Sequence, residues 1–463
     1  MTAAETRRRD SDPRAAAIHS LVRWERGGRY INLELDSMLE KSKLSPKDRA
    51  LYAALVYGVC ERIITLDGEI TRLCGRDTEK IDTETLTALR LGIYQLNYMD
   101  KIPSHAAVNE TVGCAPERSR TLVNAALRRF IREGGKIKPP DINKVGAGEY
   151  LSAVHSVPLW IVNLWQKDYP DDVAELCAAA NRRPPATLRV NDLKITPGEL
   201  LIKIKENYPG AEINSVCPDM IDLPAGAVIT ELYGYDDGLW FVQDAASRIC
   251  AAACGAAAGE TVIDVCAAPG GKSFSLALDM KNRGRVISFD IHKNKLGLIR
   301  DGAARLGLDI IEAGERDGRT PDEKLFGTAD CVLCDAPCSG LGVLAKKPDI
   351  RYKKEDDIKR LPEIQYALLS ASAAYVREGG RLVYSTCTLR RAENDDIREK
   401  FLSEHKEFSP YPVRAYEISA EDGAVTLMPY KKLSEEPTSR ADTEQNTGNT
   451  DGFYITEFIR NGK

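Results

Sequence analysis

The sequence has no long hydrophobic run, few cysteines for its length and no strong excess of either charge. Its 463 residues contain no apolar stretch of about 18 residues, which excludes a membrane-spanning helix. Arg7, Arg8 and Arg9 are not followed by an apolar segment, so no secretory signal is predicted. Twelve cysteines in so long a chain do not indicate the disulfide scaffold of a small secreted protein. We therefore expect reduced thiols and a cytoplasmic location.

The cysteine spacing does not predict a metal site. The Cys-x-x-Cys pair Cys331 and Cys334 lies in an apolar, strand-like run and has no second pair to match it. A tetrahedral zinc site needs further cysteine or histidine ligands at suitable spacing. We expect no bound metal.

The net charge is small, but it is unevenly distributed. The chain has 64 Lys and Arg against 69 Asp and Glu, a net charge of −5. Residues 1–150 carry 25 basic and 21 acidic side chains, and residues 116–138 form a basic cluster. Its arginines are candidate contacts to nucleic-acid phosphates: Arg118, Arg120, Arg128, Arg129 and Arg132. The alternative is an ordinary solvated helix face.

Residues 1–138 are predicted to be entirely helical. Ser45-Pro46-Lys47-Asp48 is typical of a helix start, and Leu51, Leu55 and Val59 follow at helical spacing. Pro139 and Pro140 end this region. Residues 139–240 are predicted to be a linker plus a small α+β module, with a strand at 187–191 and a helix at 200–205.

Residues 241–463 are predicted to form a doubly wound, Rossmann-like α/β domain. Short apolar runs, typical of buried parallel strands, alternate with helical stretches. The runs lie at residues 261–266, 285–289, 309–312, 329–334 and 381–384. A final strand is predicted at residues 453–459, after a polar stretch at 431–450 that is predicted to be a flexible loop.

A glycine-containing loop after the first of these strands predicts a nucleoside-binding site. Residues 264–272 read Asp-Val-Cys-Ala-Ala-Pro-Gly-Gly-Lys, and Asp290 follows the next strand, placed to accept ribose hydroxyls. One alternative is a plain tight turn, with Asp290 capping a helix. Another is a phosphate-binding P-loop, since Lys272 is followed by Ser273, but Cys266 stands where that loop needs glycine.

Two cysteines lie just beyond strand ends on the same predicted sheet edge. Cys338 follows Asp335 after one strand, and Cys387 directly follows another. Buried cysteines are usually apolar filler, but this shared position favours chemistry. A thiolate that adds to carbon 6 of cytosine makes carbon 5 nucleophilic toward a methylsulfonium group. A carboxylic acid would stabilise the adduct, and a base must then remove the carbon 5 proton.

These motifs resemble the RNA 5-methylcytosine methyltransferases of the RsmB (Sun, Fmu) family over almost the whole chain. The resemblance implies that Cys387 attacks the base, that Cys338 assists product release, and that Asp335 contacts both base and cofactor. It implies that S-adenosylmethionine is bound by residues of the loop and of three strand ends: Cys266, Ala267, Ala268, Pro269, Gly270, Gly271, Lys272, Asp290, Asp317 and Asp335. Further matching segments include Lys347–Ile350, Glu393-Asn394 and Asp451–Phe453.

The N-terminal helices are similar to the NusB-like RNA-binding domain of the same branch, for example at residues 55–59 and 123–128. This likeness implies a 16S rRNA substrate, methylated at the cytosine numbered 967, either as naked rRNA or in a partly assembled small subunit. The alternatives are tRNA or 23S rRNA as the substrate, or an RNA-binding factor without catalysis. We expect a monomer.

Overall fold

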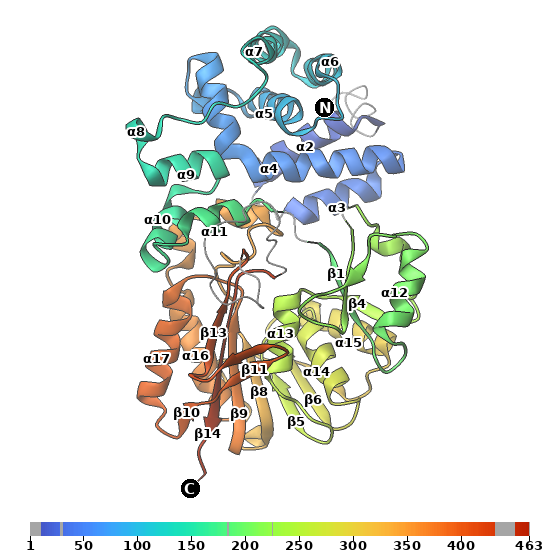
Figure 1. The fold of residues 1–463 in the computed structure, drawn as a ribbon, viewed down its shortest axis with the longest axis vertical. Coiled ribbons are helices and arrows are strands. Elements are labelled where there is room, and N and C mark those ends of the chain that lie inside the picture. The colour runs from blue at the N-terminus through green and yellow to red at the C-terminus, as the bar shows by residue number, and fades with distance from the viewer. Residues whose placement is uncertain (1–10, 28–30, 183–184, 225, 431–449, 463) are drawn as a thin grey trace. The chain divides into compact units, whose positions relative to one another are not determined.

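The chain divides into two compact units, which are shown together in Figure 1. The computed structural model describes residues 11–27, 31–182, 185–224, 226–430 and 450–462. The first unit comprises residues 1–181 and 347–353, and the second comprises residues 182–346 and 354–463. The polar stretch predicted as a flexible loop lies outside the described residues, apart from its last position, Thr450. No helix in the described parts is long and apolar enough to cross a membrane.

The first unit is helical; this confirms the prediction for residues 1–138, and the unit also includes helices at residues 142–179, a range predicted to be a linker and part of the α+β module. Its helices are α2 (Pro13–Gly27), α3 (Ile31–Lys41), α4 (Pro46–Cys74), α5 (Thr83–Tyr98), α6 (Ser104–Cys114), α7 (Arg120–Arg132), α8 (Ile142–Val145), α9 (Ala147–His155), α10 (Leu159–Asp168) and α11 (Val173–Ala179). The predicted start of α4 is confirmed, because the Ser45 side chain accepts a hydrogen bond from the Asp48 N–H and Pro46 begins the helix. Leu55 and Val59 pack into the helical core.

A short segment from much later in the sequence completes this helical unit. The 3-10 helix η6 (Pro348–Tyr352) brings in Arg351, whose side chain is only 1% exposed. The Arg351 guanidinium donates to backbone carbonyls from four residues: Glu61, His155, Ser156 and Ala180. The Tyr352 hydroxyl donates to the carbonyl of Cys60, and its ring packs edge-on against Trp24. The helical unit is therefore assembled from two separate stretches of chain, and a division at residue 138 alone does not capture it.

Replacing Arg351 with methionine is expected to destabilise the helical unit by about 2–4 kcal/mol. The change leaves several buried carbonyls without a donor, which costs more than the hydrogen bonds themselves are worth. Urea unfolding followed by tryptophan fluorescence measures the loss. The exposed Arg76 of the same unit supplies the matched control, Arg76→Met. Equal unfolding midpoints for the two variants would contradict the prediction.

The second unit begins with a small antiparallel sheet that carries one helix. Its elements are β1 (Thr187–Val190), α12 (Pro197–Lys205), β2 (Glu212–Ile213), β3 (Met220–Asp222) and β4 (Trp240–Val242), with strand order β2-β3-β1-β4. A capping box formed by Thr196 and Glu199 fixes the start of α12. Leu188, Ile204 and Trp240 are buried between the sheet and the helix. The predicted α+β module is confirmed.

The main sheet of the second unit has mixed strands in the order β10-β14-β9-β8-β5-β6-β7, and β13 pairs with β14. The strands are β5 (Thr261–Asp264), β6 (Arg285–Asp290), β7 (Ile311–Glu315), β8 (Ala329–Asp335), β9 (Val376–Thr386), β10 (Phe408–Pro410), β13 (Ala424–Leu427) and β14 (Phe453–Arg460). Strands β5 to β9 are parallel, and β14 runs antiparallel to β9. A separate small pair is formed by β11 (Val413–Ala415) and β12 (Ile418–Ala420).

Helices cover both faces of this sheet (Figure 1). They are α13 (Ala245–Ala253), α14 (Gly271–Asp279), α15 (Leu296–Leu306), α16 (Leu361–Ala373) and α17 (Asp395–Glu404). Neighbouring strand residues point to opposite faces: Val262 packs in the core with α13, α14 and α15, whereas Ile263 packs with α16 and α17. The doubly wound fold is confirmed, although β7 begins at residue 311, two residues later than predicted.

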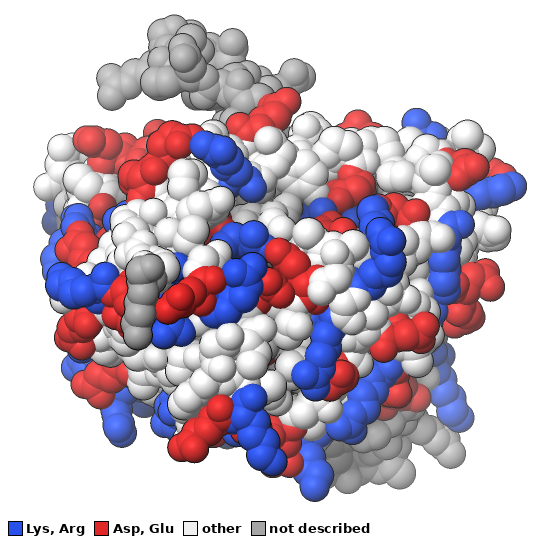
Figure 2. All heavy atoms as spheres, turned by 90° about the horizontal axis from the view of Figure 1, so that it is seen from below, with Lys and Arg blue, Asp and Glu red and all other residues white. Residues whose placement is uncertain are grey.

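Charged side chains of both signs are mixed on one face of the molecule. Figure 2 shows lysine and arginine interspersed with aspartate and glutamate across that face. A face of mixed charge does not create the broad positive potential that attracts a polyanion.

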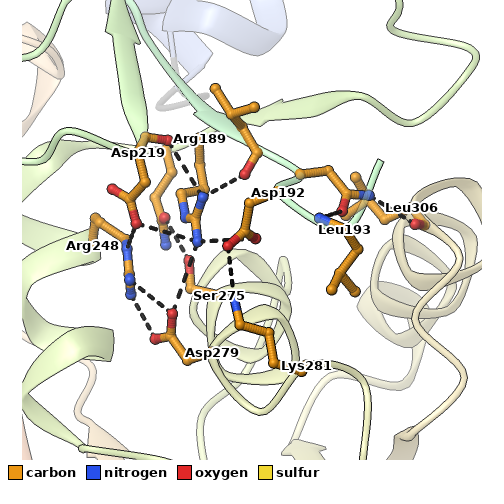
Figure 3. A network of polar contacts seen from close by, with 12 residues as sticks. Arg189, Asp192, Leu193, Asp219, Arg248, Ser275, Asp279, Lys281 and Leu306 are labelled. Atoms are coloured by element: carbon orange, nitrogen blue, oxygen red, sulfur yellow. Dashed lines mark hydrogen bonds and ion pairs between the residues drawn. The ribbon is translucent and has the colours of Figure 1, made fainter. Parts of the chain in front are cut away.

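An ion network ties the small sheet to the helices of the main sheet (Figure 3). Arg248 of α13 binds Asp279 of α14 through two hydrogen bonds, at 2.7 and 2.8 Å, and Asp219 at 2.9 Å. Arg189 of β1 lies 3.2 Å from the same Asp219 and 3.8 Å from Asp279. Paired in this way, the buried arginines have the counter-charges that burial requires.

A buried acid in β14 makes the stability of the second unit depend on pH. Glu457 is 1% exposed, and burial raises its pKa to about 9. The folded state therefore retains a proton that the unfolded chain releases above about pH 4.5, so stability falls as pH rises from 5 to 9. Glu457→Gln is expected to flatten this fall by up to about 1.4 kcal/mol per pH unit. Denaturant midpoints at several pH values test this, with exposed Glu378→Gln as the control that should leave the slope unchanged.

Candidate active site

The predicted chemical groups lie at the carboxyl ends of adjacent parallel strands. Asp264 ends β5, Asp290 ends β6 and Asp335 ends β8, while Cys387 directly follows β9. Strands β6 and β8 lie on opposite sides of β5, so the direction of winding reverses there. Ligands of open α/β sheets bind outside the carboxyl ends of the strands at such a reversal. The topology therefore gathers the acids and thiols in one place.

The two cysteines are in contact. Cys338 Sγ and Cys387 Sγ are 3.2 Å apart, and both side chains are partly buried. The hydrogen bond to Cys387, together with burial, raises the pKa of the Cys338 thiol well above its ordinary value. Either thiol can act as the donor in this contact. The two sulfurs are therefore close enough for one to influence the chemistry of the other.

Asp335 is held by a lysine that the sequence had suggested for cofactor binding. Lys272 Nζ lies 2.7 Å from one carboxylate oxygen of Asp335, and Ser385 Oγ donates to the other oxygen at 2.8 Å. Burial acts to lower the pKa of Lys272, but the negative charge of Asp335 outweighs it and the pKa is raised. The lysine is therefore charged, and its contact with Asp335 orients that carboxyl group beside the cysteine pair.

Buried polar residues form hydrogen bonds with the segments that carry Cys338 and Cys387. Glu393, which is fully buried, accepts a hydrogen bond from the Ser339 N–H at 2.9 Å and another from Gln365 Nε2 at 2.8 Å. Gln365 Nε2 also donates to the carbonyl of Pro337. Asn394 accepts from the Thr386 hydroxyl at 2.6 Å. Sequence comparison matched Glu393 and Asn394 to family segments but assigned them no role. Their burial could not be predicted, because a glutamate and an asparagine after a strand are usually exposed.

The loop between β5 and α14 suits a nucleoside ligand. Gly270 has φ of +117°, and a Cβ there would lie 2.5 Å from the Phe274 ring, so this turn requires glycine. Asp290 accepts hydrogen bonds from the Ala268 N–H at 3.2 Å and the His292 N–H at 2.8 Å, which fixes its carboxylate beside the loop. The first N–H groups of α14 begin at Gly271 and add donors to the same edge.

Asp264 begins the predicted cofactor loop but was not among the predicted cofactor-binding residues. Its side chain is buried, and burial raises its pKa to about 7. One carboxylate oxygen accepts from Ser273 Oγ at 2.7 Å, while Oδ1 has no partner in the described parts of the chain. An unmatched buried acceptor at a strand end fits a ligand that brings a positively charged or hydrogen-bonding group. Together with Asp290, it makes the loop compatible with a charged nucleoside cofactor.

Asp317 and Cys266 are less directly placed for binding. Asp317 lies two residues after β7, and its carboxylate is paired with Arg319, the closest approach being 2.6 Å. This pairing lowers the pKa of Asp317. The Cys266 side chain packs against the core formed by α16 and α17, and burial raises its pKa well above the ordinary value. Within the described residues, no group of three or more His, Cys, Asp or Glu is placed to hold a metal ion.

The five candidate arginines are all exposed, but most have partners within the protein. Arg118 pairs with Asp82 and Glu84, and Arg129 pairs with Glu133. Arg120 donates to the carbonyl of Ala115, and Arg128 donates to the Asn124 side chain. Arg132 has no ion-pair partner among the residues that the structure describes. Arg120, Arg128 and Arg132 are therefore the three without an acidic partner among the described residues, and Arg128 and Arg132 lie in the second half of α7.

Comparisons with known proteins agree with this arrangement. Residues 253–459 match the family described as 16S rRNA methyltransferase RsmB/F, residues 11–132 match the NusB family, and residues 157–230 match the ferredoxin-like domain of RsmF/B-like methyltransferases. The chain is 36% identical to the "probable ribosomal RNA small subunit methyltransferase B" of Bacillus subtilis, over 97% of this chain and 99% of that protein. The chain belongs to the RsmB/F family of methyltransferases. The Pseudomonas syringae ribosomal RNA small subunit methyltransferase B is 31% identical, with 97% of each chain covered.

Solved structures place this RsmB/F member among methyltransferase folds. The crystal structure of PH0851 covers 96% of this chain and 98% of its own, with a TM-score of 0.73 and 24% identity. A methyltransferase homolog protein from Pyrococcus horikoshii covers 66% of this chain and 97% of its own, with a TM-score of 0.54 and 25% identity. The RsmB/F member is thus a methyltransferase with a NusB-like helical part, a ferredoxin-like part and a Rossmann-like catalytic part.

Proposed function

We propose that the protein methylates carbon 5 of a cytosine in small-subunit ribosomal RNA, using S-adenosylmethionine. The observation that carries this proposal is the contact between Cys338 and Cys387 at the ends of two adjacent strands, beside Asp335. A plain RNA-binding factor has no need of two touching thiols and an acid at one edge of the sheet. We include in the proposal that the enzyme works as a monomer in the cytoplasm.

The side chains suit a covalent route. Cys387 adds through its thiolate sulfur to carbon 6 of the cytosine, which breaks the carbon 5–carbon 6 double bond and makes carbon 5 nucleophilic. A carboxylic acid at Asp335 would donate a hydrogen bond to the ring nitrogen and stabilise the added electron pair. After carbon 5 has gained its methyl group, a base takes the carbon 5 proton, the C–H electron pair re-forms the carbon 5–carbon 6 double bond, and the carbon 6–sulfur bond breaks to release the Cys387 thiolate. Cys338, held against Cys387, is placed to assist that last elimination.

S-adenosylmethionine, when bound, supplies an electrophilic methyl group on a positively charged sulfur. Asp290 would accept its ribose hydroxyls, and the loop from Cys266 to Gly271 would line it with backbone donors. Asp264 offers a buried oxygen without a partner in the described residues. Asp317 and Lys272 complete the proposed set, with Lys272 acting through Asp335.

The helical unit would contribute RNA affinity through the exposed face of α7. Arg128→Glu/Arg132→Glu is expected to weaken binding of 16S rRNA and to reduce the dependence of log K on log salt by about one for each lost phosphate contact. Filter binding at several salt concentrations measures both effects. The control, Lys203→Glu/Lys205→Glu, makes the same charge change on α12. Unchanged affinity and salt slope in the α7 variant would remove α7 from the RNA-binding surface.

The first experiment uses S-adenosylmethionine labelled in its methyl group. The protein is incubated separately with unmodified 16S rRNA, 23S rRNA, tRNA and partly assembled small subunits, and the labelled nucleoside is identified by mass spectrometry after digestion. We expect 5-methylcytidine in 16S rRNA or in the partly assembled subunit, at the cytosine numbered 967. Label only in tRNA or 23S rRNA would preserve the chemistry and overturn the substrate. No label in any of the four would overturn the proposed function and favour a binding factor.

A further inference from the structure

Three backbone segments meet beside Cys387 at a pair of glycines. The Gly342 N–H donates to the Cys387 carbonyl at 3.0 Å, and the Gly452 N–H donates to the Gly342 carbonyl at 2.9 Å. A Cβ on Gly342 would lie 2.0 Å from the Gly452 carbonyl oxygen, and a Cβ on Gly452 would lie 2.8 Å from Gly342 Cα. Only glycine permits so close an approach. The backbone of Cys387 therefore depends on where the Gly342 loop and the start of β14 lie.

A single lysine joins the same segments through side chains. Lys346 follows Gly342 closely in the sequence. Its ammonium group binds Asp244 and lies 3.0 Å from Asp451. Asp451 immediately precedes Gly452. Asp244 caps the start of α13 by accepting from the Ala246 N–H at 2.8 Å. Lys346 thus links the loop that carries Cys338 both to the start of β14 and to the segment that leads into α13.

The segment that contains Asp244 also reaches the cofactor loop. Gln243, the preceding residue, donates to the Gly271 carbonyl at 3.0 Å and accepts from Ser275 Oγ at 2.7 Å. A displacement of residues 243 and 244 would therefore be passed to the beginning of α14. We call Lys346, Asp244 and Asp451 the Lys346 cluster. It connects the segment that contacts the cofactor loop to the segments that contact Cys387.

The cluster has two acids for one lysine, in a largely buried place. Burial and the charge of Asp244 raise the pKa of Asp451 to about 7, against the opposing effect of Lys346. Burial acts to lower the pKa of Lys346, but the two carboxylates outweigh it and the pKa is raised. The lysine is therefore charged under all ordinary conditions. Its removal would leave two facing carboxylates and would loosen all three segments.

We propose that Lys346 is a positioning residue for methyl transfer: by holding Asp244 and Asp451 together, it fixes the position of Cys387 relative to the cofactor loop. The inference rests on the proposed function, since it assumes that Cys387 attacks the base. Lys346 touches none of the groups proposed to react. Its expected effect is on the rate of attack, because small displacements of a nucleophile cost up to about 10²-fold in rate.

The test measures how fast Cys387 attacks, separately from how well the protein folds or binds. In a Cys338→Ala background, single-turnover formation of the covalent protein–RNA adduct is followed on denaturing gels. Lys346→Met is expected to slow adduct formation about 10- to 100-fold, with RNA affinity within about twofold of the parent. Lys346→Arg should recover most of the rate. Lys281→Met, which removes a lysine paired with Asp192 at 2.8 Å in the same unit, should leave the rate unchanged.

A double variant separates positioning from stability. Lys346→Met/Asp451→Asn removes the clash of charges and is expected to recover the unfolding midpoint but not the rate of attack. Should Lys346→Met fail to fold, this double variant decides the question. Recovery of the rate together with the midpoint, or a parental rate in the folded Lys346→Met protein, would overturn the proposal. If the Cys338→Ala parent itself forms no adduct and the wild type makes no 5-methylcytidine, the proposed function has failed instead.

Discussion

Replacing Cys338 with alanine is expected to accumulate a covalent complex between protein and RNA, whereas Cys387→Ala is expected to abolish both the complex and methylation. The two sulfurs are 3.2 Å apart and have different proposed roles: Cys387 attacks the base, and Cys338 assists release of the product. Without the Cys387 sulfur no bond to carbon 6 forms, and losses on removing a nucleophile are about 10⁴-fold or more. Without Cys338 the bond between the Cys387 sulfur and carbon 6 still forms. Its breakage is slow, because the thiol that is proposed to assist it is absent. Denaturing gels with labelled 16S rRNA measure the complex.

Two further variants make this prediction strict. Cys338→Ala/Cys387→Ala should form no complex, because the attacking sulfur is absent. Cys74→Ala, a partly buried cysteine of the helical unit, should behave as the wild type. A complex that persists in Cys387→Ala and vanishes in Cys338→Ala would reverse the two roles.

The parts of the fold that local chemistry determines could be predicted from the sequence. Ser45, Pro46 and Asp48 mark a helix start because each satisfies a specific need of a first turn, and α4 begins there. The apolar runs predicted as strands became β5, β6, β8 and β9, since only a sheet covered on both faces buries such runs. Because parallel strands share one carboxyl edge, the approach of Asp335, Cys338 and Cys387 also followed from order along the chain.

Contacts between distant segments could not be predicted. Arg351 looks like one more surface arginine in a polar stretch, yet it is buried among backbone carbonyls of the helical unit. Nothing in its neighbouring residues specifies those carbonyls, which come from residues about 170 to 290 positions away. Lys346 and Glu393 are similar cases. Their partners are set by packing of whole elements, and a charged residue carries the same local signal whether it is exposed or buried and paired.

Lys272 shows how a motif can locate a residue without revealing what its side chain does. The loop from Asp264 to Lys272 was predicted as a cofactor loop, and its backbone fits that role. The ammonium group, however, binds Asp335 on the neighbouring strand at 2.7 Å and lies 5.3 Å from the centre of the Phe453 ring. The backbone of Lys272 is therefore part of the loop, whereas its side chain contacts Asp335.

We expect Lys272→Met to lower kcat by about 10²- to 10³-fold, the scale found when one fixed charge is removed from a reacting site. Asp335 would lose its counter-charge and its orientation. Breaking the partly buried pair should also lower the stability by about 3 kcal/mol. Steady-state kinetics with 16S rRNA and urea unfolding measure the two effects, and Lys272→Arg should retain part of the activity.

Combining this change with Asp335→Asn distinguishes charge balance from catalysis. Lys272→Met/Asp335→Asn contains no unpaired charge, so most of the lost stability is expected to return. Activity should stay low, because an amide cannot supply the acidic proton that a carboxylic acid gives to the ring. A double variant that regains both stability and kcat would mean that Lys272 and Asp335 only support the fold. A double variant that regains stability alone places the pair in the reaction, where Lys272 orients Asp335 toward the base.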